Sequence, residues 1–327
     1  MDLTRSDERK GIRYNTDFEM NNSINPIIVI PAASREEHIG SVFNHVFSVM
    51  FQTEQTDINR AGNIVWDFSG CTFLHPFYLA ALSVLKFKYQ GRITCQGAKP
   101  LIKSYFDIVY FADPLVVTEG CDRDGISRKY SEKTYLPICV FNPKDKSSII
   151  AQELVQHIVK NQLRGSTDIF GILSLLLAEL IDNITDHSHS PNGFIFCQRI
   201  PKEGNLYVFI GDSGRSIYSS YAADPRYSGM LSTAESSALA LALQGKSTKN
   251  RPENENRGYG ISKSRSLIVE GLKGEFFILS GGSFYRHDPQ GETLVDLPDA
   301  IRWDGTVVLL KIPTAIPREF NIYDYIS

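Results

Sequence analysis

Long apolar runs are missing from this sequence, and so is any excess of charge. The most apolar stretch, residues 173–181, is interrupted by Glu179, so no segment reaches the length that a bilayer-spanning helix needs. A formal net charge of −3 on 327 residues gives no basic surface of the kind that attracts nucleic acid or an anionic membrane. We therefore expect a protein that binds neither membranes nor nucleic acid.

Cysteine is scarce and does not occur in pairs. The five cysteines are scattered, odd in number and include no Cys-x-x-Cys pair. This pattern is typical of reduced, buried thiols and favours a cytoplasmic location. Residues 1–25 are too polar for a signal peptide, and we expect them to form a flexible arm.

The length and composition fit a globular protein of two domains. In the first half, β-branched or apolar runs alternate with helical spacing: strands are predicted near 26–31, 63–68 and 92–95, and helices near 35–52 and 77–88. Such alternation predicts an α/β domain, which we place at 26–140. Residues 142–146 have turn chemistry and are the best linker candidate, so the second domain is expected at 147–327.

The segment 63–89 resembles the central strand, loop and helix of STAS domains, the fold of anti-sigma-factor antagonists. The resemblance rests on a strand that ends in Asp67, on Phe73, and on small residues such as Ala80 in the following helix. STAS domains often carry a phosphorylated Ser or Thr at the start of this helix. Here residues 74–77 read Leu-His-Pro-Phe, so no phosphorylation switch is expected there. A generic α/β domain remains the alternative.

The second half is organised around one long predicted helix, residues 169–190. Its buried face is built by apolar residues at steps of three and four: Leu173, Leu176, Leu177, Leu180 and Ile184. Beside that face, Glu179, Asn183 and His187 recur every four residues and so form one stripe. Because burying such groups without partners costs several kcal/mol, we expect solvent, a polar network or a ligand to satisfy them.

Two glycine-containing turns follow this helix. A predicted strand at 206–211 runs into Asp212, and Gly214 then lets the chain turn away while the carboxylate faces a ligand donor. Further on, Gly258 and Gly260 precede a helix predicted at 261–269, whose first N–H groups suit a phosphate. The tripeptide at 245–247, Gly-Lys-Ser, imitates a P-loop, but position 240 is Ala and a helix is predicted before it, so we reject that interpretation.

Taken in order, these motifs resemble the GHKL superfamily, which comprises gyrase-type and MutL-type ATPases, histidine kinases and anti-sigma-factor serine kinases. The matching elements are Glu179-x-x-x-Asn183 on a helix, Asp212-x-Gly214 after a strand, Gly258-x-Gly260, and Thr306 at the start of the last strand. The resemblance covers 147–313 and implies the Bergerat ATP-binding fold, an α+β two-layer sandwich. The whole chain is thus expected to be α/β, a STAS-like domain followed by this ATP-binding domain.

The resemblance also implies roles for individual residues. Asn183 would bind Mg²⁺ at the phosphates of ATP, and Glu179 would be the general base that polarises water. Asp212 would accept the adenine amino proton, with Gly214 and Thr306 beside the base. Gly258 and Gly260 would lie at the phosphates. Residues 218–257 would form the ATP lid, in which Lys249 and Arg257 are either phosphate contacts or ordinary loop charges. His187 suits the end of a helix, and we expect it to be structural.

The function that this implies is an Mg²⁺-ATP-binding regulatory protein that hydrolyses ATP slowly and switches the contacts of a protein partner. Two alternatives stay open: a serine/threonine protein kinase of the anti-sigma type, and an interaction module whose nucleotide site has decayed. Ser216 motivates the second, because the family has a glycine there. Histidine autophosphorylation is not expected, since no acceptor motif precedes the domain. A homodimer also stays open.

Overall fold

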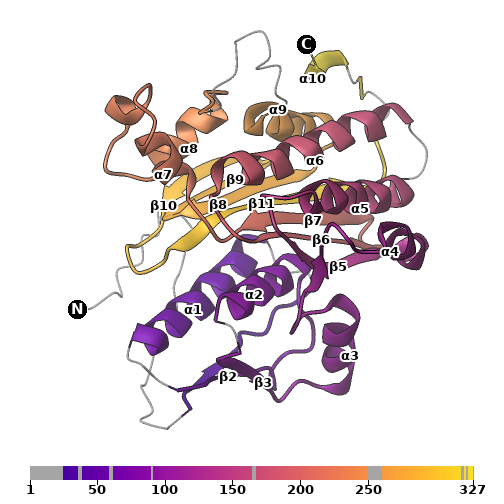
Figure 1. Cartoon of the computed structure of the whole chain (residues 1–327), viewed down its shortest axis with the longest axis vertical. Coiled ribbons are helices and arrows are strands. Elements are labelled where there is room, and N and C mark those ends of the chain that lie inside the picture. Colours follow the sequence, from indigo (N-terminus) through magenta and orange to yellow (C-terminus); the bar gives the residue numbers. More distant parts are fainter. Residues whose placement is uncertain are drawn as a thin grey trace. The chain divides into compact units, whose positions relative to one another are not determined.

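The computed structural model describes residues 25–35, 39–58, 62–89, 91–163, 167–248, 260–317, 320–321 and 323–326. The chain divides into two compact units, Met1–Pro114 and Leu115–Ser327. Each unit has its own β-sheet with helices packed on it (Figure 1). The prediction of a mixed α/β protein is therefore confirmed.

The first unit contains a three-stranded parallel sheet of order β1-β2-β3. Its elements alternate along the chain as β1 (Ile27–Val29), α1 (Ile39–Ile58), β2 (Ile64–Asp67), α2 (Pro76–Lys88), β3 (Ile93–Gln96) and α3 (Pro100–Val109). Parallel strands need such crossover helices to connect them. The alternation predicted from the sequence is confirmed for the first five of these elements.

One face of this sheet carries the core of the first unit. Ile28, Trp66 and Ile93 are buried on it, and the indole Nε1 of Trp66 donates to Thr53 Oγ1 of α1 over 3.3 Å. Helix α2 begins at Pro76, where a missing N–H costs nothing, and the side chain of His75 accepts a hydrogen bond from the Phe77 N–H. A proline thus occupies the first turn of the helix that was expected near 77–88.

The second unit is built on an eight-stranded sheet of order β10-β9-β8-β11-β7-β6-β5-β4. Its strands are β4 (Leu115–Val117), β5 (Tyr135–Phe141), β6 (Gly193–Ile200), β7 (Asn205–Asp212), β8 (Glu275–Gly281), β9 (Ser283–Asp288), β10 (Gly291–Asp296) and β11 (Trp303–Pro313). Its helices are α4 (Arg123–Tyr130), α5 (Ser147–Gln162), α6 (Thr167–His187), α7 (Ile217–Ala222), η2 (Ser228–Met230), α8 (Ser236–Leu243), α9 (Ile261–Ser266), η3 (Leu267–Gly271) and α10 (Tyr323–Ile326). All neighbouring strands are antiparallel except β4 and β5.

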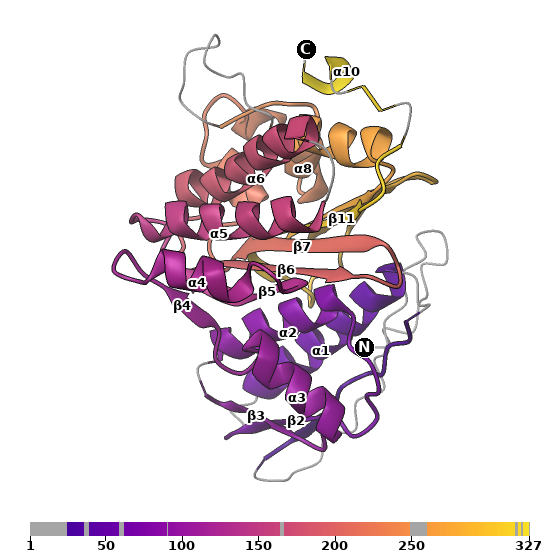
Figure 2. The same ribbon diagram turned by 90° about the vertical axis from the view of Figure 1, so that its right-hand side faces the viewer.

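Helices α5 and α6 lie side by side on one face of this sheet (Figures 1 and 2). The apolar stripe of α6 forms the core with that face: Leu173, Leu176 and Leu177 are fully buried, as are Val208 and Ile210 of β7. Burying such a side chain stabilises the fold by about 1.5–3 kcal/mol. The long helix predicted from its periodicity is therefore confirmed, and its polar stripe lies at the border of the core.

The boundary between the units differs from the expected one. Strands β4 and β5 pair with the second sheet, for example Cys139 with Ile195, so the division lies at Pro114 instead of after residue 140. Residues 142–146 form the turn from β5 into α5, in which Ser147 Oγ donates to the Asn142 carbonyl. Turn-forming residues occur both in linkers between domains and in turns within a domain. Only the pairing of strands that are distant in the sequence shows which of the two a segment is.

Two further features of the second unit were not predicted. Strand β9 was missed because Arg286 and His287 interrupt its apolar pattern. The helix expected at 261–269 is α-helical only to Ser266 and continues as the π-helical turn η3.

Within the residues that the structure describes, no helix combines the length and apolarity required to cross a membrane.

Candidate functional site

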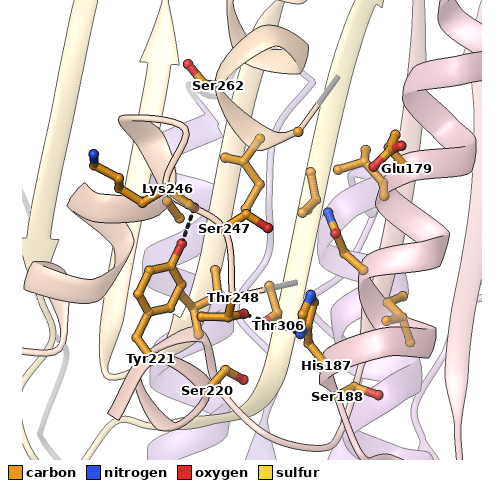
Figure 3. A pocket seen from close by; sticks show the side chains of 18 of the residues that line it. Glu179, His187, Ser188, Ser220, Tyr221, Lys246, Ser247, Thr248, Ser262 and Thr306 are labelled. Carbon is orange, nitrogen blue, oxygen red and sulfur yellow. Dashed lines mark hydrogen bonds between the residues drawn. The ribbon is translucent and has the colours of Figure 1, made fainter. Parts of the chain in front are cut away.

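A cavity of about 580 Å³ opens between α6, the sheet and residues 242–248 and 260–263 of the second unit (Figure 3). The residues proposed from the sequence that line it are Glu179, Asn183, His187, Asp212, Gly260 and Thr306. They come from four separate segments of the chain, and the fold brings them together. Lys249, Arg257 and Gly258 lie outside the described residues.

The polar stripe of α6 forms one wall of the cavity. Glu179, Asn183 and His187 are half-buried and all face it, as their four-residue spacing predicts. An amide and a carboxylate on one helical stripe therefore present oxygen ligands to the cavity.

Asp212 lines the cavity at the end of β7. Its side chain is 2% exposed, and each carboxylate oxygen accepts one backbone N–H: Oδ1 from Gly214 at 2.8 Å and Oδ2 from Thr306 at 3.3 Å. A carboxylate oxygen can accept two hydrogen bonds, so both retain a lone pair for a donor on a ligand.

Gly214 connects this carboxylate to the end of α6. The Arg215 N–H donates to the Ser188 carbonyl over 2.5 Å, which joins the turn after β7 to the chain leaving α6. A Cβ at Gly214 would overlap Ser188 O and lie 2.8 Å from Ser190 N. Only glycine permits this approach, which explains its place two residues after Asp212, although Gly214 itself does not line the cavity.

A bulge in β11 places Thr306 beside Asp212. The register of β11 against β8 shifts between Trp303 and Thr306, where Gly305 has φ +84°. The bulge turns the Thr306 N–H toward Asp212, and the Thr306 hydroxyl pairs with Ser280 Oγ at 2.8 Å.

Burial raises the pKa of Asp212 from 3.8 to about 7, and this outweighs the two backbone N–H groups, which lower the pKa. Between pH 3.8 and about 7, the Asp212 carboxyl is ionised in the unfolded state and protonated in the folded state. The free energy of unfolding therefore falls as the pH rises through this range. Between pH 5 and pH 8, the ionisation of Asp212 lowers the free energy of unfolding by about 3 kcal/mol.

Urea denaturation at both pH values, compared with Asp212→Asn, isolates this contribution, because the other titrating groups cancel. We expect the stability of the wild type relative to the variant to fall by that amount. A difference that is the same at both pH values would contradict the raised pKa.

Several residues of the cavity were missed by sequence reasoning. Four cations line it, Arg215, Arg226, Lys246 and Lys263, together with Tyr221 and Tyr227. Lys246 belongs to the Gly-Lys-Ser tripeptide that was rejected as a P-loop. The helix predicted before it is confirmed as α8, yet these residues still face the cavity. No local pattern marks the other residues.

The region expected to form a lid, 218–257, is mostly folded up to residue 248. Helix α8 belongs to the core, where Ala238 and Leu239 are fully buried. Its start is fixed to the turn between β8 and β9 and to the start of β11, because Glu235 accepts the Gly282 N–H at 2.9 Å and pairs with Arg302. Any motion of this region that leaves the core intact must therefore exclude α8.

Ser216, at the position where the GHKL motif would have a glycine, does not line the cavity. It is 4% exposed and caps α7, accepting the Ser219 N–H at 3.2 Å. Ser216 thus fixes the start of a helix outside the cavity lining.

No group of three or more His, Cys, Asp or Glu side chains is placed to hold a metal ion within the described part of the chain. Magnesium is usually held by one or two protein oxygens together with substrate phosphates, so such a group is not required for it. The side-chain oxygen of Asn183, which lines the cavity, suits that arrangement.

Comparisons of the chain with models of known families, with curated proteins and with solved structures gave no match. The geometry of the cavity is therefore the basis for any functional conclusion.

Proposed function

We propose that the second unit binds Mg²⁺-ATP in this cavity, as proteins of the GHKL type do, and that nucleotide state alters the contacts of a protein partner. The observation that carries the proposal is the buried carboxylate of Asp212 in the lining of a cavity that also holds four cations. The amino group of adenine can donate a hydrogen bond to the Asp212 carboxylate. The negatively charged triphosphate can pair with the four cations. A cavity of about 580 Å³ is within the usual range for cofactor sites.

The roles of the α6 residues follow from their chemistry. Asn183 would hold Mg²⁺ together with the phosphates, and the ion would neutralise charge on them. Glu179, one helical turn away on the same wall, can accept a proton from water. We also propose that the first unit is a STAS-like domain and that the second unit has the Bergerat fold.

Thermal unfolding of the full chain tests the proposal. A ligand that binds only the folded state raises Tm in proportion to the logarithm of its concentration. We expect a non-hydrolysable ATP analogue with Mg²⁺ to raise Tm progressively, and Mg²⁺ alone to leave it unchanged. No shift at millimolar nucleotide would refute ATP binding and favour an interaction module whose nucleotide site has decayed.

Glu179→Gln is expected to bind ATP with unchanged affinity and to hydrolyse it about 100-fold more slowly, because a general base contributes rate and little ground-state binding. Phosphate release under single-turnover conditions measures the effect. Glu153→Gln on α5, outside the cavity lining, is the matched control. Hydrolysis by the Glu179 variant at the wild-type rate would show that this carboxylate is not the base.

A further inference from the structure

One side of the cavity is made by residues 245–248, which we call the wall segment. All four residues line the cavity, and the segment leaves α8 at Gly245, where φ is +80°. Residues 246–248 belong to no helix or strand. Contacts outside regular structure must therefore fix the position of this wall.

Two tyrosines hold the wall segment from one side. The hydroxyl of Tyr221 on α7 donates to the Lys246 carbonyl, and that of Tyr227 donates to the next carbonyl, Ser247 O, at 3.1 Å (Figure 3 shows the first). The centres of the two rings lie 5.2 Å apart. Tyr221 is 5% exposed, and burial raises the pKa of its phenol well above the usual value, so the hydroxyl stays a donor.

On its other side, the wall segment reaches α6. Thr248 Oγ1 lies 3.4 Å from Nδ1 of His187, the last residue of the polar stripe (Figure 3). The segment thus spans from α7 to α6, across the helix-covered face of the sheet.

We infer that Tyr221 and Tyr227 are positioning residues of the cavity, which hold the wall segment in place before a ligand arrives. Their side chains act through the backbone of Lys246 and Ser247. A wall that is already ordered does not lose conformational entropy on binding, and this favours affinity. The inference deepens the proposed function and rests on it where ATP is the probe.

Hydrogen exchange of the ligand-free protein tests the anchoring without any nucleotide. In Tyr221→Phe/Tyr227→Phe, peptides that cover 245–248 should exchange about tenfold faster, while β7 and β11 stay protected. Tyr218→Phe is the matched control: Tyr218 lies on the same helix, but its hydroxyl donates to Ser232 O at 3.0 Å. Unchanged exchange of the wall segment in the double variant would overturn the inference.

The affinity for a non-hydrolysable ATP analogue with Mg²⁺ tests whether the ordered wall segment favours ligand binding. The double variant should bind about tenfold more weakly, mainly through faster dissociation, and Tyr218→Phe should bind like the wild type. Equal affinity of the double variant and the wild type would overturn the inference. If the wild type itself fails to bind, the proposed function is refuted, and the exchange experiment alone decides whether the tyrosines hold the wall. If the double variant does not fold, both measurements are made on Tyr221→Phe and on Tyr227→Phe separately.

Discussion

Asp212→Asn is expected to weaken ATP binding by about 100-fold. In the wild type both carboxylate oxygens accept a backbone N–H and retain lone pairs for a ligand. Asparagine replaces one oxygen with an NH₂ group, which would face either a backbone N–H or the adenine amino group. Donor then meets donor inside a buried site, where a lost hydrogen bond cannot be replaced by water.

Calorimetric titration with a non-hydrolysable ATP analogue measures this loss. Asp296→Asn is the matched control, because Asp296 also accepts a backbone N–H and a second hydrogen bond, both from Ser236 at 2.8 Å, and lies outside the cavity lining. We expect that control to bind normally. Wild-type affinity in Asp212→Asn would show that Asp212 does not contact the ligand.

Gly305→Ala should be the most destabilising small substitution at the site, lowering the free energy of unfolding by about 3–5 kcal/mol. Its φ of +84° is strained for alanine, and a Cβ would overlap Asp212 Oδ1 and lie 2.5 Å from the Asp212 backbone oxygen. The bulge in β11 would have to move, and the Thr306 N–H with it.

Urea denaturation measures this change. Gly171→Ala on α6 is the control: a Cβ there meets no atom within 4 Å, and alanine in a helix should stabilise the fold by about 0.5–1 kcal/mol. If Gly305→Ala were as stable as the wild type, the close packing of the bulge against Asp212 would be contradicted.

The sequence predicts the parts of the site that depend on local periodicity or a local turn. The stripe of Glu179, Asn183 and His187 follows from helical spacing, and Asp212 follows from an apolar strand ended by a glycine turn. These patterns involve residues a few positions apart, where the geometry of the backbone alone decides what shares a face.

The parts that could not be predicted depend on contacts between distant segments. The unit boundary was misplaced because it is decided by pairing between β5 and β6, such as Val140 with Phe194. The tyrosines were missed for the same reason, since Tyr221 and Lys246 are 25 residues apart in the chain and meet only in the folded unit. Aromatic residues in a polar stretch carry no signal of such a partner.

The central claim is that Asp212 recognises the amino group of adenine, and titration of the wild-type chain with ATP and with inosine triphosphate, both with Mg²⁺, tests it most directly. Inosine has a carbonyl oxygen at C6 in place of the amino group and carries a hydrogen on N1, so the comparison removes the donor at C6. We predict saturable binding of ATP and binding of inosine triphosphate about 100-fold weaker, because its oxygen would face the carboxylate. Equal binding of the two nucleotides, or no binding of ATP at millimolar concentration, would contradict the account.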